Sequence, residues 1–189
     1  MATAVTETLL KAEEFRRLPD DGRLKELKRG RIILMNLPAP RHGEICGQVY
    51  YLLRRHLEDH PLGRLVTNDS GIITEHDPDT VRGADVAFYS YQRVPPGPLP
   101  QGYLPVAPEL VFEVRSPGDR WGRIWGKVGE YLEASVKVVC VLDQMTERCH
   151  VYRNEEEIQV FLPDQDLTLP DVLPEFRIVV RRFFEEAEG

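Results

Sequence analysis

The stretch Leu110-Val111-Phe112-Glu113-Val114-Arg115 predicts a buried β-strand. Side chains of a strand alternate between two faces, which places Glu113 and Arg115 together on one of them. A helical pattern over residues 120–134 comes next, followed by the most apolar strand pattern of the chain, over residues 136–143. A strand, a helix and a second strand in this order predict a parallel crossover unit.

The rest of the chain alternates strand patterns, one long helical pattern and turn-rich connections. This order predicts an α/β fold of the α+β kind, with one mixed sheet, helices packed against it and a single domain over residues 1–189. The expected elements are a hairpin within residues 24–36, a helix over 42–57, strands over 65–75 and 84–89, a proline-rich loop over 94–108, a strand over 148–153 and edge strands within 167–180.

The composition is that of an ordinary globular protein, with 42% hydrophobic and 29% charged residues among 189. The net charge is −7, and residues 154–189, with ten acidic and three basic residues, carry the whole excess. We expect residues 181–189 to form an acidic tail. Proteins that bind phosphates mainly through their overall field are basic, so any contact with nucleic acid must be local.

No segment of the sequence predicts export or a membrane anchor. The longest apolar run, near residues 138–142, is far shorter than the roughly 20 residues that span a bilayer. No basic segment leads into an apolar one at the N-terminus. The three cysteines, Cys46, Cys140 and Cys149, have no paired spacing and are expected to be reduced thiols. We therefore expect a cytoplasmic protein.

Two acidic residues interrupt the apolar strand patterns. Glu113 lies in the strand quoted above, and Asp85 lies near the start of the strand over residues 84–89. A buried carboxylate is unfavourable unless a cation or a hydrogen-bond donor pairs with it. Each acid also has an ordinary explanation, because Glu113 could pair with Arg115 at the surface and Asp85 could cap a turn.

A lysine accompanies the two acids on the helix that follows. Lys127 lies on the flank of the expected core stripe, near Arg120 and Arg123. Its long side chain could bring the ammonium group to a polar site, although a solvated lysine would look the same in the sequence. The expected core stripe consists of Trp121, Ile124, Trp125, Val128 and Leu132.

Two carboxylates on neighbouring strands and a nearby lysine are the groups used in metal-assisted cleavage of phosphodiesters. Carboxylate oxygens bind hard cations such as Mg²⁺, and a bound metal polarises a phosphoryl oxygen and activates a water molecule. An ammonium group can stabilise the extra negative charge of the transition state. No single residue of the three is decisive, so the inference depends on their order along the chain.

The ordered motifs resemble those of a large family of bacterial restriction-endonuclease-like proteins in the PD-(D/E)XK nuclease superfamily. The resemblance covers about residues 22–180, nearly the whole chain. The segments that carry it are residues 26–27, 40–43, 83–88, 102–104, 108–117, 127–132, the strand ending at Asp143, and residues 151–153 and 171–176.

The resemblance implies an αβββαβ core with an N-terminal hairpin and C-terminal edge strands, and an endonuclease that uses Mg²⁺ or Mn²⁺. Asp85 and Glu113 match the two catalytic acids, which also bind the metal. Lys127 matches the catalytic lysine, displaced onto the following helix, and Glu26 matches a further metal ligand. His42 matches a recurrent position. The implied partners are nucleic acid, with DNA expected, and a second copy of the chain, because cutting both strands needs two sites.

Two positions depart from the superfamily pattern. Ala84 replaces the proline before the first acid, which shapes a turn and carries no chemistry. Arg115 stands where the superfamily usually has lysine, and arginine keeps its proton, so it can clamp a phosphate but cannot act as a base. Without Lys127 in the site, cleavage would be weak or absent. The candidates for binding the substrate are Arg115, Arg120, Arg123 and His42.

Two other functions remain open on the sequence alone. The acidic tail and Arg115 favour a catalytically silent nuclease-fold module that binds nucleic acid or protein. His56 and His60, four residues apart on a helix, suggest a zinc-binding structural domain, although no third ligand is near in sequence. Cys46, four residues after His42, is expected to be a small buried thiol.

Overall fold

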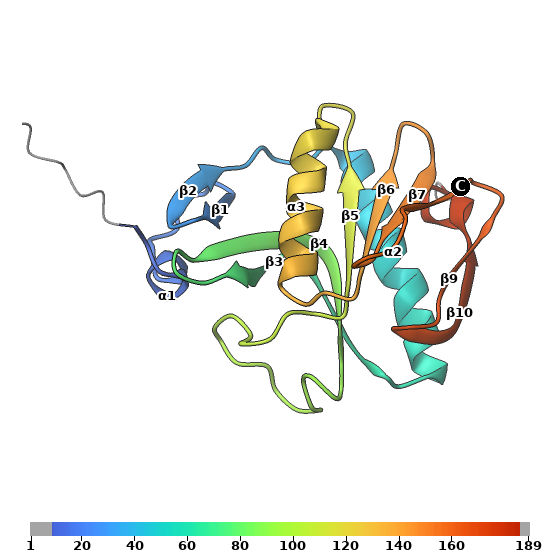
Figure 1. The fold of residues 1–189 in the computed structure, drawn as a ribbon, viewed down its shortest axis with the longest axis horizontal. Coiled ribbons are helices and arrows are strands. Elements are labelled where there is room, and N and C mark those ends of the chain that lie inside the picture. Colours follow the sequence, from blue (N-terminus) through green and yellow to red (C-terminus); the bar gives the residue numbers. More distant parts are fainter. Residues whose placement is uncertain (1–8, 186–189) are drawn as a thin grey trace, which may run out of the picture.

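The chain folds around one mixed sheet, as Figure 1 shows. The computed structural model describes residues 9–185. The helices are α1 (Ala12–Arg16), α2 (Pro40–Asp59), α3 (Trp121–Glu133) and the 3₁₀ helix η1 (Val180–Phe183). The strands are β1 (Lys25–Lys28), β2 (Arg31–Leu34), β3 (Gly63–Glu75), β4 (Thr80–Ser90), β5 (Leu110–Arg115), β6 (Val138–Asp143), β7 (Arg148–Tyr152), β8 (Gln159–Phe161), β9 (Asp166–Leu169) and β10 (Leu173–Val179). The main sheet has the order β2-β1-β4-β5-β6-β7-β8, and β3 pairs with β4.

The segment α2-β3-β4-β5-α3-β6 has the order of the predicted αβββαβ core. Strands β5 and β6 are parallel, with Leu110 opposite Val138 and Arg115 opposite Asp143, which confirms the crossover unit. The N-terminal hairpin is also confirmed, because β1 and β2 pair antiparallel on either side of residues 29–30. The mixed α/β architecture expected from the sequence is therefore the observed one.

The two faces of the main sheet carry separate apolar cores. Helix α2 covers one face, and its residues Ile45, Val49 and Leu53 join the cluster that contains Val86 and Phe112. Helix α3 covers the other face, where Ile124, Val128 and Tyr131 join the cluster that contains Val111 and Val141. Because side chains alternate along a strand, Glu113, next to Phe112 in β5, is directed toward the α3 side.

The buried face of α3 differs from the predicted stripe. Trp125 is 54% exposed, and its indole N–H donates to the Tyr152 hydroxyl at the periphery of the sheet. The face toward the sheet is formed instead by Ile124, Lys127, Val128 and Tyr131. The helix is thus rotated relative to the prediction, because its polar lysine and tyrosine have partners inside the protein.

The C-terminal strands expected within residues 167–180 form, but β9 and β10 pair with each other in a separate two-stranded sheet. Strand β8 forms one edge of the main sheet, opposite β2. Residues 181–185 do not form the start of a tail as predicted, because Phe183 and Phe184 of the η1 region are buried in the α2-side core. Residues 186–189 lie outside the described part of the chain.

Two further features concern membranes and thiols. Within residues 9–185, no helix combines the length and the apolar character needed to cross a bilayer. Cys46, Cys140 and Cys149 carry free thiols.

Candidate active site

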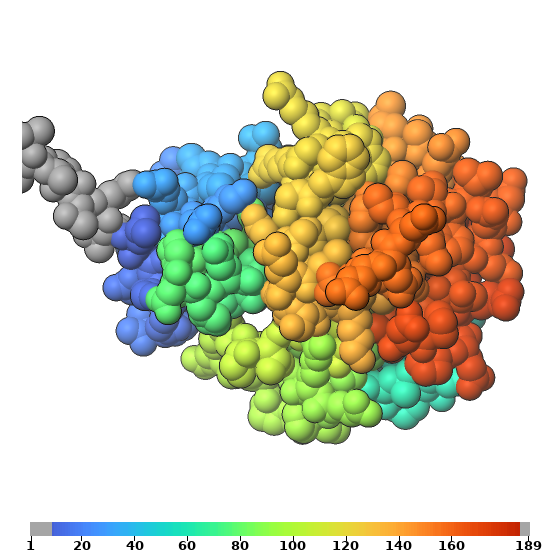
Figure 2. Space-filling model, viewed as in Figure 1, coloured from blue at the N-terminus to red at the C-terminus, as the bar shows by residue number. Residues whose placement is uncertain are grey.

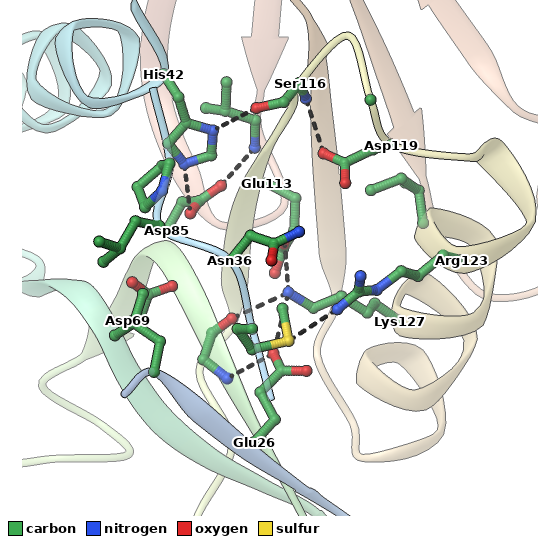
Figure 3. A pocket seen from close by; sticks show the side chains of 18 of the residues that line it. Glu26, Asn36, His42, Asp69, Asp85, Glu113, Ser116, Asp119, Arg123 and Lys127 are labelled. Atoms are coloured by element: carbon green, nitrogen blue, oxygen red, sulfur yellow. Dashed lines mark hydrogen bonds and ion pairs between the residues drawn. The ribbon is translucent and has the colours of Figure 1, made fainter. Parts of the chain in front are cut away.

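The site begins where β4 and β5 separate. These antiparallel strands pair from Phe88 opposite Leu110 to Val86 opposite Phe112, where their register ends. Just beyond, the backbone N–H of Val114 donates to Oδ2 of Asp85 at 2.6 Å. We call this place, formed by Asp85 and Val114, the fork. The hydrogen bond fixes the Asp85 carboxylate between the strands, with its Oδ1 atom directed toward His42 (Figure 3).

Glu113 and Lys127 meet beside the fork. The Nζ atom of Lys127 lies 2.8 Å from Oε2 of Glu113, and it also donates to the backbone oxygen of Gly83 at 3.1 Å. The Tyr131 hydroxyl donates to Oε1 of Glu113 at 2.7 Å. Glu113 is 4% exposed and Lys127 is 8% exposed, so both charges lie away from bulk water. Two residues of α3 therefore fix both oxygens of the β5 carboxylate.

Glu26 enters the same group from strand β1. Its Oε1 atom lies 3.4 Å from Nζ of Lys127, and the backbone N–H of Gly83 donates to it at 3.2 Å. Its Oε2 atom accepts a hydrogen bond from Nη1 of Arg82 at 2.7 Å. The guanidinium of Arg82 also pairs with Glu130 of α3, with Nη2 2.8 Å from Oε1. Arg82 thus holds the hairpin carboxylate against the sheet.

The buried charges shift one another's pKa values. Burial raises the pKa of Glu113, and the nearby Asp85 carboxylate adds to that rise, while the Lys127 ammonium opposes it. Burial alone would lower the pKa of Lys127, but the carboxylates of Glu113, Glu26 and Asp85 together raise it above the usual lysine range. Lys127 is therefore protonated at neutral pH, and negative charge is concentrated around its ammonium group.

His42 in the first turn of α2 closes the other side of the fork. Its Nε2 atom lies 3.1 Å from Oδ1 of Asp85, and its Nδ1 atom lies 3.2 Å from Oγ of Ser116. The N–H of Ser116 donates to Asp119 at 2.9 Å, which fixes the turn after β5. Burial acts to lower the pKa of His42, but the hydrogen bond and charge of Asp85 raise it overall.

Most of these groups line one pocket of about 400 Å³, whereas Arg82, Glu130 and Tyr131 lie outside it. Its walls come from residues 35–39, the first turn of α2, the fork and one side of α3 (Figure 3). The β1–β2 hairpin lies beside α3 on the surface (Figure 2), and there Nζ of Lys28 lies 3.4 Å from Oε1 of Glu130. The predicted site residues that line the pocket are Glu26, His42, Asp85, Glu113, Arg123 and Lys127.

Two of the predicted arginines lie away from the pocket. Arg115 points along the sheet to Asp143, with Nη1 2.7 Å from Oδ1, and stacks over the Trp121 ring. Arg120 is the exposed residue before α3 and does not line the pocket. Arg123 lines the pocket, and its Nη2 atom donates to Sδ of Met35 at 2.8 Å.

Asp69 is a pocket residue that the sequence did not single out. It lies at an irregularity of β3, between the register pairs of Thr67 and Ser70, with a φ of 52°. Its carboxylate faces the pocket near Asp85 (Figure 3). Burial, followed by the charge of Asp85, raises the pKa of Asp69. No local sequence pattern marks it, because its position depends on the bulge in β3.

Comparisons with known proteins agree with this arrangement. The sequence profile of the Uma2 family, described as "Putative restriction endonuclease", matches residues 12–181. The chain belongs to the Uma2 family. A crystal structure of a protein described as a "putative nuclease belonging to DUF820", from Anabaena variabilis ATCC 29413, superposes with a TM-score of 0.77 at 19% identity. The superposition covers 93% of this Uma2 chain and 97% of the other, so the two share their fold over nearly their whole length. No curated protein matches the sequence.

Proposed function

We propose that this protein is a metal-dependent endonuclease that hydrolyses phosphodiester bonds of nucleic acid, with Asp85, Glu113 and Lys127 as its catalytic residues. The observation that supports it most is the meeting of the three side chains in one pocket, with Nζ of Lys127 2.8 Å from Glu113 and the Asp85 carboxylate at the adjoining fork. Membership of a restriction-endonuclease family supports the same activity.

The chemical type of the pocket's donors suits a hard divalent cation. Asp85, Glu113 and Glu26 offer carboxylate oxygens from three neighbouring strands, and oxygen is the ligand that Mg²⁺ and Mn²⁺ prefer. Burial of Glu113 beside Asp85 raises the pKa of Glu113, and a cation would relieve this repulsion. Bound Mg²⁺ or Mn²⁺ would supply Lewis-acid chemistry that polarises the phosphoryl oxygen and lowers the pKa of water.

The protein's own groups perform the remaining steps. The protonated Lys127 stabilises negative charge that develops on the phosphoryl group, and the carboxylates that surround it keep its proton in place. Tyr131 orients Glu113 through its hydrogen bond. Arg123 and His42 at the walls contact the sugar-phosphate backbone. DNA as the substrate, a homodimer that cuts both strands and a cytoplasmic location complete the proposal.

A second candidate is a catalytically silent member of the fold that binds nucleic acid or protein. One observation favours it: Lys127 and Arg82 already pair with Glu113 and Glu26, which balances much of the buried negative charge without a metal ion. Metal titration calorimetry separates the two candidates, because a protein that binds neither Mg²⁺ nor Mn²⁺ cannot perform the proposed reaction.

Plasmid nicking in Mg²⁺ or Mn²⁺ tests the enzymatic proposal. Asp85→Asn and Glu113→Gln should each lower the rate by about 10² or more, because they remove charged ligands while keeping side-chain shape. Asparagine is preferred to alanine at position 85 because its side-chain oxygen can still accept the Val114 hydrogen bond. Glu133→Gln, at an exposed acid of α3, is the matched control. Equal cleavage by the site variants and the wild type would contradict the assignment.

A further inference from the structure

A second set of potential metal ligands lies on the α2 side of the fork. His42 and Cys46 are four residues apart on α2, so their side chains project from the same face of the helix. His42, Cys46 and Asp85 each offer one ligand atom, and these three atoms lie within 4.8 Å of one another. In a tetrahedral zinc site, bonds of about 2.0–2.3 Å place the ligand atoms about 3.3–3.8 Å apart. Of the three, Nε2 of His42 and Oδ1 of Asp85, 3.1 Å apart, already lie near that spacing.

The surroundings orient two of these ligands. Ser116 contacts Nδ1 of His42 at 3.2 Å, which leaves Nε2 directed at Asp85, 3.1 Å away. The N–H of Val114 occupies Oδ2 of Asp85, so Oδ1, which contacts Nε2 of His42, is the oxygen that can exchange this contact for a bond to a cation. Such contacts to the outer atoms of ligands set their orientation and strengthen metal sites. His42 and Asp85 both line the pocket, so water can complete the coordination.

We propose that His42, Cys46 and Asp85 form a binding site for a thiophilic divalent cation, Zn²⁺ in particular, distinct from the all-oxygen site proposed for Mg²⁺ or Mn²⁺. An imidazole, a thiolate and a carboxylate are a donor set typical of zinc, and Mg²⁺ does not favour sulfur. Both sites use Asp85, so the two cations compete. The consequence that Zn²⁺ inhibits cleavage rests on the proposed nuclease function, whereas zinc binding itself does not.

Zinc binding at this site is a ligand exchange without oxidation. The Cys46 S–H bond ionises, its proton passes to the buffer, and the sulfur forms a bond to Zn²⁺. The proton that Nε2 of His42 shares with Asp85 is given up to the buffer, a neutral imidazole takes one up at Nδ1 next to Ser116, and Nε2 then donates its lone pair to Zn²⁺. The hydrogen bond between His42 and Asp85 is replaced by bonds from both residues to the cation.

Cobalt spectroscopy on the full metal-free chain tests the site directly, because Co²⁺ bound to a thiolate gives a charge-transfer absorption in the near ultraviolet. Wild-type protein should show this band, and Zn²⁺ should displace it. Cys46→Ala should lack the band and lose more than about tenfold in zinc affinity. Cys140→Ala and His60→Asn, which change a cysteine and a histidine outside the cluster, should keep both. Circular dichroism checks that each variant is folded.

Absence of the band in the wild type, or equal zinc affinity in wild type and Cys46→Ala, would overturn the proposal. Calorimetry tests the shared ligand: saturating Mn²⁺ should weaken zinc binding in the wild type, and unchanged zinc affinity would refute competition at Asp85. A final measurement compares the cleavage rate with Zn²⁺ to the rate without it. Zn²⁺ should reduce the rate more in the wild type than in Cys46→Ala. If no preparation cleaves DNA, the nuclease proposal fails, and the cobalt spectra still decide the zinc site.

Discussion

Replacing Lys127 by methionine tests whether the buried ammonium group holds the site together. Methionine has a similar length and stays apolar, so it fills the same space without the charge. The variant loses the contacts of Nζ with Glu113 at 2.8 Å, Glu26 at 3.4 Å and the Gly83 carbonyl at 3.1 Å. Two carboxylates, each 4% exposed, then lose their shared cation.

The expected loss follows from these contacts. Removing one partner of a buried ion pair costs about 3–5 kcal/mol, because the other charge stays buried and uncompensated. Two features favour the lower end: Arg82 still pairs with Glu26 at 2.7 Å, and Glu113, whose pKa is already raised by burial, can take up a proton. A loss of about 3 kcal/mol corresponds to a decrease of roughly 6–12 °C in Tm for a chain of this length.

Urea denaturation of the metal-free protein near neutral pH, followed by circular dichroism, measures this free energy of unfolding. Lys137→Met, at an exposed lysine, is the matched control and should change it by less than about 0.5 kcal/mol. The double variant Lys127→Met/Glu113→Gln should recover part of the loss, since it removes the unpaired charge as well. A single variant as stable as the control would refute the view that Lys127 compensates the buried acids.

Two further predictions concern other buried hydrogen bonds. Tyr131→Phe keeps the ring in the core but removes the 2.7 Å hydrogen bond to Glu113, so it should lower the free energy of unfolding by about 2 kcal/mol. Urea denaturation measures this change, and an unchanged midpoint would show that the hydroxyl is dispensable. Burial acts to raise the pKa of Asp79, but hydrogen bonds from the N–H groups of Ala12 and Asp77 lower it overall in the folded protein. The Asp79 carboxylate therefore stabilises the fold above the unfolded pKa of about 4, and this stabilisation is lost as the pH falls through the pKa of Asp79 in the folded protein. Between these two values the wild type should lose stability with falling pH more steeply than Asp79→Asn, and parallel acid-denaturation profiles would contradict this.

The convergence of Asp85, Glu113 and Lys127 could be anticipated from the sequence. Strand alternation in residues 110–115 fixes the face of Glu113, and a parallel crossover places the following helix over that same face. The rotation of α3 about its own axis was harder to predict, because the helix carries two overlapping apolar stripes, one with Trp125 and the other with Tyr131, and either could face the sheet. Only the partners available inside the protein, Glu113 above all, select the stripe that buries Lys127.

Features that depend on register or docking could not be predicted. Arg115 turns toward Asp143 because the parallel register places the two residues opposite each other, and local sequence does not specify that register. Cys46 approaches Asp85 only because α2 packs across the end of the fork. Asp69 reaches the pocket through a bulge in β3, which neither its neighbours nor its residue type predicts.

The short bond at the fork gives one backbone amide an unusual sensitivity. The Val114 N–H donates to one oxygen of Asp85, whose other oxygen contacts His42 (Figure 3). Any change in the electron density of that carboxylate, through protonation or through a cation that replaces His42 on its other oxygen, is transmitted across the hydrogen bond to the amide proton. The nuclear resonance of Val114 therefore acts as a built-in reporter of what Asp85 holds, at a position that needs no chemical label.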